Sequence, residues 1–245
     1  MNNLLLVQPE GSRPRLIKAL TANGTAVHEH SFIQIEPLSG DLSPLESADV
    51  VVWVSKNAVS FAKSLTLKLP PTVRMYSVGP GTAKLACQQF SYPTQCPLNV
   101  HSSEGLLALP ELQQLDNQHW CIIKGYGGRE LLANSLAQRG AQVSKVNVYQ
   151  RKKKPLIDAQ TMQNWITSVD SIVVTSAEQL AIFLSQVPST ATTWLAQCHW
   201  FLPSKRLATL ISFVDPSNVT ITQSASETTM IETLINHGSD YDRHK

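Results

Sequence analysis

Residues 119–151 read HWCIIKGYGGRELLANSLAQRGAQVSKVNVYQR, and this stretch contains one complete strand–helix–strand unit. The apolar run at 119–124 predicts a strand. The amphipathic stretch at 128–139 predicts a helix that stops at Gly140, and residues 142–150 predict a second strand. Two strands joined by a helix usually pair in parallel with a right-handed crossover. The stretch therefore predicts an α/β protein built on parallel sheets.

The same alternation runs along almost the whole chain. Runs rich in Val, Ile and aromatic residues predict further strands at 4–7, 27–35, 49–54, 74–78, 171–175, 199–202 and 218–223. Amphipathic stretches predict further helices at 12–23, 56–66, 81–90, 103–115, 158–168, 177–187, 204–213 and 226–237. Roughly nine strands are too many for one flavodoxin-like sheet of about five strands, so two sheets are expected.

Two segments look different, because they alternate apolar and polar residues and have no evident crossover role. We expect residues 27–37 and 143–153 to pair as a ladder that joins two lobes. The domain boundaries are a hypothesis that also rests on the resemblance given below: a discontinuous α/β domain of 1–34 plus 152–245, a second α/β domain of 36–148, and linkers at about 33–37 and 148–153.

Composition limits the classes of function. The chain has 245 residues, 42% of them hydrophobic, and a formal net charge of only +2, so a nucleic-acid partner is not expected. No apolar run reaches the roughly 20 residues that span a bilayer, and Met1-Asn2-Asn3 leads straight into a strand without a secretory signal, so we expect a cytoplasmic protein with no membrane partner. The four cysteines form no CxxC pair and are expected to be reduced and mostly buried.

Several strand-to-helix turns carry small or hydroxyl residues, where free helix N–H groups suit anions. Each serine could equally be an ordinary N-cap, as for Ser103, Ser176 and Ser226, but the set is typical of a wide binder for a ligand with many carboxylates or phosphates. GYGGRE at 125–130 is neither a Walker A loop nor GxGxxG, and no GxSxG elbow occurs. His28 and His30 share one strand face without a third metal ligand, which favours a surface or ladder position.

Four segments together resemble the uroporphyrinogen-III synthase family, especially its bacterial members. They are DVVVWVSKNAVSFA (49–62), YSVGPGTAKL (76–85), the stretch from SEGLLALPELQQL to the end of VNVYQR (103–151) and VVTSAEQL (173–180). The resemblance covers essentially the full chain. It implies two flavodoxin/Rossmann-like parallel-sheet domains joined by a two-stranded antiparallel ladder, with the active site in the interdomain cleft.

The resemblance also implies an activity. Family members are hydro-lyases (EC 4.2.1.75) of haem and sirohaem biosynthesis, which cyclise hydroxymethylbilane, a linear tetrapyrrole, to uroporphyrinogen III. Water is lost and ring D is inverted through a spiro intermediate. No cofactor or metal is implied. A monomer is expected, with a transient contact to the preceding pathway enzyme as a further partner.

The family pattern gives candidate site residues. Tyr149, in the Val-Tyr-Gln segment, is the candidate general acid, because a phenol carries its proton at neutral pH. Its alternative is a tyrosine packed on the ladder with its hydroxyl in water. Expected contacts to substrate carboxylates are Ser55, Lys56, Thr82, Ser103, Arg129, Ser176 and Ser204.

The chain departs from the family in two turns. Gln8-Pro9 stands where many bacterial members have Thr-Arg-Pro, and Arg13 or Arg15 could compensate for that arginine. Residues 202–206 read LPSKR where some members have Gly-x-Thr, so the hydroxyl role passes to Ser204. The basic run 151–154 either steers a polyanion or is a solvated hinge. Two alternative functions stay open: a two-lobed small-molecule binding protein without chemistry, and a regulatory module on the same fold.

Overall fold

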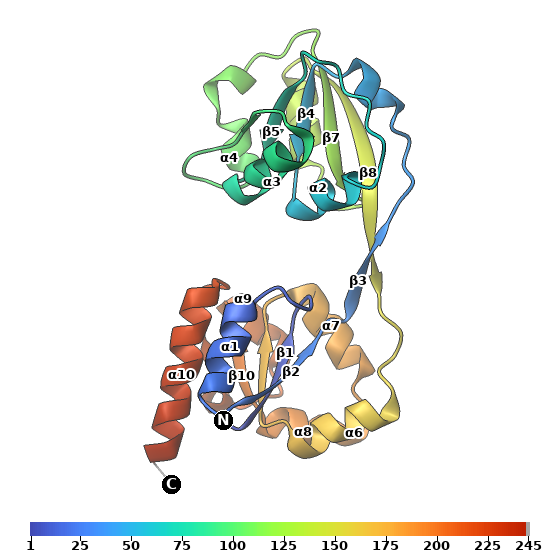
Figure 1. The fold of residues 1–245 in the computed structure, drawn as a ribbon. Helices are drawn as coiled ribbons and strands as arrows, with labels where there is room; N and C mark the ends of the chain where they lie inside the picture. Colours follow the sequence, from blue (N-terminus) through green and yellow to red (C-terminus); the bar gives the residue numbers. More distant parts are fainter. Residues whose placement is uncertain (244–245) are drawn as a thin grey trace. The chain divides into compact units, whose positions relative to one another are not determined.

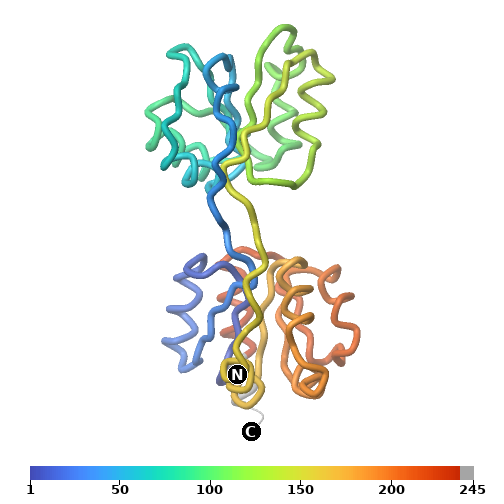
Figure 2. Tube along the Cα trace, turned by 90° about the vertical axis from the view of Figure 1, so that its right-hand side faces the viewer, coloured from blue at the N-terminus to red at the C-terminus, as the bar shows by residue number. Residues whose placement is uncertain are grey.

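A computed structural model describes residues 1–243, with side chains up to residue 237. The chain divides into two compact units. Unit 1 contains residues 1–34 and the chain from Lys153 onward, and unit 2 contains Ile35–Lys152. The chain passes between the units twice, once in strand β3 (Ile33–Pro37) and once in β8 (Gln142–Lys153), as the tube in Figure 2 shows. That the units are separate folding domains stays a prediction.

Unit 1 is built on a five-stranded parallel sheet. Its strands are β1 (Asn3–Val7), β2 (Ala26–His30), β9 (Ser171–Val174), β10 (His199–Leu202) and β11 (Val219–Ile221), in the spatial order β11-β10-β9-β1-β2. Numbered along this unit the order is 2-1-3-4-5, which is the flavodoxin order. Strands β1, β9 and β10 are buried on both faces, which explains why their sequences show no polar alternation.

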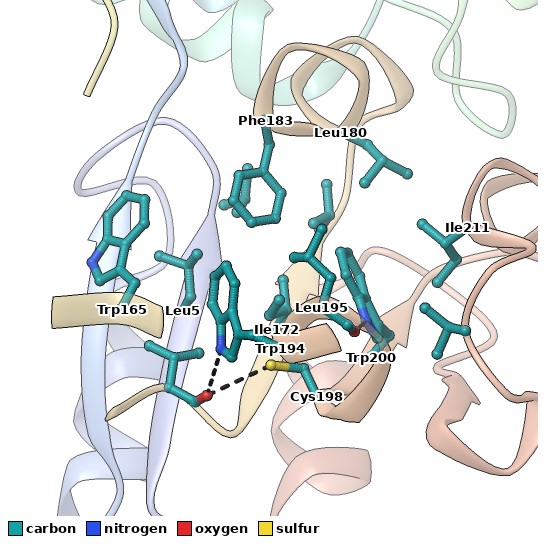
Figure 3. Close-up of a cluster of buried hydrophobic side chains, with 14 of the residues drawn as sticks. Leu5, Trp165, Ile172, Leu180, Phe183, Trp194, Leu195, Cys198, Trp200 and Ile211 are labelled. Atoms are coloured by element: carbon teal, nitrogen blue, oxygen red, sulfur yellow. Dashed lines mark hydrogen bonds between the residues drawn. The ribbon is translucent and has the colours of Figure 1, made fainter. Parts of the chain in front are cut away.

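Helices cover both faces of this sheet (Figure 1). Helices α1 (Pro14–Ala22) and α10 (Glu227–Arg243) pack on one face, and α6 (Ala159–Ser168), α7 (Ala177–Gln186) and α8 (Thr192–Gln197) pack on the other. Three indole rings lie in the second core, and two of them, Trp194 and Trp200, donate their N–H groups to backbone carbonyl oxygens. Trp194 Nε1 donates to the carbonyl oxygen of Val169 at 2.9 Å, which also accepts from the thiol of Cys198 (Figure 3).

Unit 2 is built on a six-stranded sheet. It contains β3, β4 (Val50–Trp53), β5 (Arg74–Ser77), β6 (Thr94–Gln95), β7 (His119–Gly125) and β8, in the order β3-β8-β7-β4-β5-β6. Without β3 the order is 3-2-1-4-5, as in the first five strands of a Rossmann sheet. Strand β3 lies beside β8 in antiparallel fashion, since Leu38 N–H donates to Val148 O while Lys154 N–H donates to Phe32 O.

Two helix pairs enclose the sheet of unit 2. Helices α2 (Lys56–Ala62) and α3 (Pro80–Phe90) pack on the face that carries Val51, Trp53 and Ile123. Helices α4 (Ser103–Leu107) and α5 (Leu131–Gln138) pack on the opposite face, on Val52, Trp120 and Ile122. The fold class is thereby confirmed: two α/β units with parallel sheets, joined through the antiparallel pair β3–β8.

Some element predictions were wrong. The single strand predicted at 27–35 is broken into β2 and β3, which belong to different sheets. The break lies at Ser31, whose hydroxyl donates to Ile33 O, and at Phe32, whose N–H donates to Gln179 Oε1 instead of to a strand. These side-chain partners replace the ladder hydrogen bonds that would have continued the strand.

Other differences concern element length. The helix predicted at 103–115 ends at Leu107, and a short 3₁₀ turn, Pro110–Leu112, follows because proline cannot continue a helix. The helix predicted at 204–213 is α9 (Lys205–Ala208) followed by a 3₁₀ turn. Helix α8 and the two-residue strand β6 were not predicted.

Candidate functional site

A pocket opens in unit 2 at the carboxyl ends of β4 and β7. The strand order of the sheet reverses between these two strands, and ligands of open α/β sheets bind at such a switch point. The cavity measures about 330 Å³. Its lining is Val54, Ser55, Ser103, Ile122, Lys124, Gly125, Tyr126, Gly127, Gly128, Arg129, Leu132, Ala133, Lys145, Tyr149 and Arg151.

A serine and a tyrosine meet at the pocket wall. Ser55 is the N-cap of α2, and its Oγ accepts the N–H of Ala58 at 3.1 Å. The same Oγ lies 3.2 Å from the phenol oxygen of Tyr149. Tyr149 is only 5% exposed, and its ring stacks on Phe61 with 5.5 Å between centroids. The phenol is therefore held by packing, and its oxygen can exchange a proton with Ser55 or with a ligand.

An irregularity of strand pairing positions Tyr149. Lys124 pairs with Asn147, but Gly125 pairs with Tyr149, so β8 contains one extra residue at this point. Such a bulge redirects the side chains that follow it. Tyr149 directly follows Val148 and would otherwise point to the other face of the sheet, but it packs in the same core as Val146 and Val148. Gly125 makes room for the ring, since a Cβ at residue 125 would lie 2.5 Å from two ring atoms of Tyr149.

Four cationic side chains line the pocket: Lys124, Arg129, Lys145 and Arg151. Glu130 pairs with two of them, Oε1 with Lys124 Nζ at 3.1 Å and Oε2 with Lys145 Nζ at 3.0 Å. The hydrogen bonds from Lys145 and then from Lys124 hold the pKa of the Glu130 carboxyl below its ordinary value. The carboxylate is therefore ionised, and it leaves one net positive charge on this group of three residues.

Arg129 has its own acidic partner, because Nη1 donates to Glu104 Oε1 at 2.6 Å. The pKa of the Glu104 carboxyl is lowered to about 2, first by the hydrogen bond from the backbone N–H of Glu104 itself, then by the one from Ser102, and then by the one from Arg129. Both side chains of this pair are more than two-fifths exposed, so the pair is weakly held and open to exchange with another carboxylate.

The turn between β7 and α5 contributes backbone groups. Gly127 and Gly128 have φ values of 74° and 83°, a conformation that favours glycine. Helix α5 then begins without a side-chain cap, and two residues of its first turn, Leu132 and Ala133, line the pocket. First-turn N–H groups lack partners within their helix, so this turn can bind anions together with the cations.

The structure brings four of the predicted site residues into this pocket: Tyr149, Ser55, Ser103 and Arg129. The N-cap alternative for Ser103 is wrong, because Ser102 caps α4 by accepting the N–H of Gly105, and Ser103 is the first helical residue.

Two further predicted residues, Lys56 and Thr82, lie outside the pocket lining of the described chain. Lys56 is exposed at the start of α2, and Thr82 is buried in the first turn of α3.

The other predicted site residues belong to unit 1. Ser176 caps α7 by accepting the N–H of Gln179, whereas Ser204 stands before α9 and makes no capping hydrogen bond with its side chain. Arg13 donates to Gln8 and to the carbonyl oxygen of Ala225, so its guanidinium is held beside the end of β1. Arg15 is exposed.

The basic run 151–154 does not act as one unit. Arg151 lines the pocket, Lys152 pairs with Glu36 at 2.7 Å, and Lys154 pairs with Glu10 at 2.7 Å. His28 and His30 lie in β2 and not in the β3–β8 pair, and each has a buried Nε2 without a hydrogen-bond partner. Within the described chain no group of three or more His, Cys, Asp or Glu residues is arranged to hold a metal ion.

Sequence reasoning missed two lysines of the pocket lining, Lys124 and Lys145, and the glutamate that pairs with both of them, Glu130. A signal was available, since Lys124 is the one charged residue at the end of an otherwise apolar strand, and buried lysines need a partner. All four cysteines are free, and the expectation that most are buried holds for only two of them: Cys121 and Cys198 are buried, whereas Cys96 is half-buried and Cys87 is exposed. Among the described residues, no helix combines the length and the apolar character that crossing a membrane requires.

Fold and site together define a two-unit α/β protein whose second sheet carries, at its switch point, a pocket lined by four cationic side chains and a phenol. The family model described as Uroporphyrinogen-III synthase HemD matches residues 8–232. The chain belongs to the uroporphyrinogen-III synthase family.

Individual relatives agree with this assignment. The chain is 30% identical over 244 residues to the uroporphyrinogen-III synthase of Salmonella typhimurium, covering 95% of this chain and 99% of that one. It is 28% identical to the Escherichia coli enzyme, with the same coverage.

Two solved structures share the fold. The uroporphyrinogen-III synthetase of Helicobacter pylori is 16% identical, with a TM-score of 0.64 over 96% of this chain and 99% of that one. A mutant uroporphyrinogen III synthase of Thermus thermophilus is 15% identical, with a TM-score of 0.60 over 98% of this chain and 100% of that one.

Proposed function

We propose that this protein is a hydro-lyase that cyclises hydroxymethylbilane to uroporphyrinogen III, with loss of water and inversion of ring D through a spiro intermediate. The observation that carries the proposal is the contact between Ser55 Oγ and the Tyr149 phenol, 3.2 Å apart, beside four cationic side chains in the switch-point pocket. Membership of the family supports the same activity.

Tyr149 acts as the general acid. The lone pair of the terminal pyrrole nitrogen drives out the hydroxyl group, the C–O bond breaks, and the phenol proton passes to the leaving oxygen to form water. The phenolate left behind is stabilised when Ser55 donates its hydroxyl proton to the phenol oxygen, since Ser55 Oγ accepts the N–H of Ala58 and keeps its own proton free to donate. Positive charge nearby adds to this stabilisation.

Choosing the isomer is a matter of position. The substrate carries eight carboxylates and closes without the enzyme to the type I isomer, so the protein must hold the chain with the substituted carbon of ring D nearest the electrophile. Arg129 and Ser103 bind substrate carboxylates in unit 2, and Arg129 exchanges its exposed partner Glu104 for a substrate group. Contacts from Lys56, Thr82, Ser176 and Ser204 are part of the same proposal.

The chain also acts as a cytoplasmic monomer in this proposal, with a transient contact to the enzyme that supplies its substrate. Four free cysteines suit a reducing compartment. Sedimentation of the purified protein, alone and with that enzyme, tests both parts: a stable dimer contradicts the first, and no change in sedimentation at high concentration of both proteins contradicts the second.

An isomer assay tests the activity. Purified protein is incubated with hydroxymethylbilane, and the products are oxidised to porphyrins and separated by chromatography. We expect the type III isomer in large excess over the uncatalysed background. A small-molecule binding protein or a regulatory module would leave only the type I isomer, and that result would refute the proposal.

A further inference from the structure

Lys124 and Lys145 of the pocket lining form a compact group with Glu130. Lys124 lies near the end of β7, and its side chain is only 11% exposed, whereas the side chains of Lys145 and Glu130 are about half exposed at 45% and 44%. Both oxygens of Glu130 are engaged, one by each ammonium group. The glutamate therefore keeps two cations beside each other.

Strand pairing explains why the two lysines meet. Lys145 of β8 pairs with Ile122 of β7, and Lys124 lies two residues beyond Ile122 on the same face of the sheet. The two side chains are consequently diagonal neighbours at the edge of the pocket. Glu130 occupies the N-cap position of α5 but does not cap the helix with its side chain, so its carboxylate is free for the lysines.

This arrangement differs from an ordinary surface ion pair. A buried ammonium group is costly without a counter-charge, so Glu130 keeps Lys124 charged inside the wall. One carboxylate facing two ammonium groups leaves one net positive charge on the three residues. The group is therefore prepared to accept further carboxylates.

The size and the apolar lining of the pocket limit which molecule can carry those carboxylates. A cavity of about 330 Å³ lies at the lower end of the ~300–1,000 Å³ range of small-molecule pockets, so it can enclose one ring of a tetrapyrrole but not the whole chain. Val54, Ile122 and Leu132 supply apolar lining next to the cations. A flat apolar ring with two short acidic chains on neighbouring carbons fits this combination.

We propose that the pocket is a subsite for a single pyrrole ring of the substrate, whose neighbouring acetate and propionate groups are bound by Lys124 and Lys145. Glu130 is a positioning residue that holds the two ammonium groups at the spacing of that carboxylate pair. This inference rests on the proposed function, because it takes the ligand to be a tetrapyrrole. It predicts that the pocket selects rings with two acidic chains over rings with one.

Binding of single pyrroles to the full-length protein tests the subsite. The probe is 3-(carboxymethyl)-4-(2-carboxyethyl)pyrrole, and the matched control ligand is 3-methyl-4-(2-carboxyethyl)pyrrole. Titration is followed by the amide signals of ¹⁵N-labelled protein. We expect the diacid to bind ~10-fold more tightly, because one charge-assisted hydrogen bond contributes at least ~1.4 kcal/mol. Shifts should concentrate at Lys124, at residues 125–128 and at Leu132. Equal affinity for the two pyrroles, or shifts elsewhere, would overturn the inference.

Variants assign the preference to this group. Lys145→Met removes one half-exposed cation, and we expect it to abolish the preference for the diacid. Lys68→Met is the matched control: Lys68 pairs with Glu46 on the surface, in the segment between α2 and β5, and it is not part of the pocket lining. The control should keep the full preference, and a loss there would show a general effect of net charge instead.

Glu130→Gln separates positioning from mere support of the fold. It keeps the size of the side chain but cannot hold two ammonium groups, so we expect KM for hydroxymethylbilane to rise ~5-fold with kcat within ~2-fold, together with a reduced diacid preference. A lower melting temperature with unchanged KM and unchanged preference would refute the positioning role. If the wild type makes no type III isomer, the proposed function fails; if it does make it but does not prefer the diacid, the subsite alone fails.

Discussion

The switch points of the two sheets make an informative comparison. In unit 2 the switch point lies between β4 and β7, and cationic side chains line a cavity there. In unit 1 it lies between β1 and β9, and the polar groups at the end of β1 bind one another. Gln8 is fully buried, its Oε1 accepts from Arg13, and its Nε2 donates to Glu29 at 2.8 Å.

Side-chain partners account for the difference. Arg13 also donates to Ala225 O, and Glu227 accepts the N–H of Leu16, so this cluster ties the end of β1 to the start of α10. Burial lowers the pKa of Arg13 while Glu227 opposes that shift, as expected for a cation enclosed by the fold. Two sheets of related topology thus carry different groups at the same edge: a brace of side-chain hydrogen bonds in unit 1 and a cation-lined cavity in unit 2.

Gly125→Ala should have the largest effect, because it attacks the pocket of unit 2 directly. The new Cβ would lie 2.5 Å from the ring of Tyr149, so the phenol must move. A displacement of about 1 Å can cost on the order of 10²-fold in rate, and we expect a loss of that order in type III formation. Steady-state assays with isomer analysis measure it.

Gly40→Ala is the control for the Gly125 variant. Its Cβ would lie 2.6 Å from the backbone oxygen of Asn147, so it also presses on β8, but it touches no residue of the pocket lining. Both variants should unfold more easily, by about 1–3 kcal/mol for overpacking. If Gly40→Ala lost as much activity as Gly125→Ala, the loss would reflect general strain in β8 and not the position of Tyr149.

Tyr149→Phe tests the chemistry at the same wall with less disturbance. The ring can keep its stacking on Phe61, and only the proton donor is lost. We expect kcat to fall ~10-fold, less than the ~10²–10⁴ often contributed by general acids, because positioning supplies most of the rate and selectivity. Circular dichroism must show an intact fold. A variant with wild-type turnover would remove the acid role and leave Tyr149 as a packing residue.

The sequence predicts most of the fold because its strands are buried on both faces. The runs LLLV, VVVW and SIVV leave no polar side, so their assignment to parallel sheets needs no tertiary information. The break at Ser31 could not be predicted, because it depends on Gln179, a residue 147 positions away from Phe32 that replaces a strand hydrogen bond. Short elements such as β6 have too little pattern to detect.

The site was predictable only in part. Ser55 and Ser103 were predicted because each lies at a recognisable helix start: Ser55 directly before α2, and Ser103 as the first residue of α4. Tyr149 was selected through the family resemblance. Strand alternation alone would place Tyr149 and Val148 on opposite faces of the sheet. The extra residue in β8 brings both side chains to the same face. The lysine pair depends on the register of β7 with β8, which a single sequence does not give.

Gln8→Leu tests the brace of unit 1. The leucine has similar volume but leaves Arg13 and Glu29 without their shared partner, which should cost about 1–3 kcal/mol in the free energy of unfolding. Type III formation at a temperature well below unfolding should stay within about twofold, since the brace holds structure and not ligand. Urea denaturation and the isomer assay measure the two effects. Unchanged stability with a large loss of activity would mean that this edge also contacts substrate.

The smallest of the four predicted effects is a loss of stability of unit 1 in acid, caused by His199. Burial, then the nearby His237 and the N-terminal amine, lower the pKa of His199 to about 4. Its Nε2 lies 2.8 Å from the Thr220 hydroxyl. The unfolded chain, whose histidine titrates near ~6.5, binds more protons than the folded state between these values, so the contribution of His199 is complete above pH 6.5 and declines as the pH falls towards 4. Because the ring is only half-buried, solvent screening reduces the effect of this pKa shift on the free energy of unfolding.

His199→Gln removes the titrating group and keeps a hydrogen-bonding side chain for Thr220. We expect its melting temperature to fall less than that of the wild type between pH 6.5 and 4, measured by calorimetry at several pH values. Carboxylates such as Glu10, whose pKa is lowered mainly by its hydrogen bond from Lys154, are present in both proteins, so their contribution cancels in the difference. Parallel curves for variant and wild type would exclude His199 as a source of acid sensitivity. A selective loss in the variant's pH response, with unchanged pyrrole binding at pH 7, would show that the β10–α10 side of unit 1 can be altered without disturbing the pocket of unit 2.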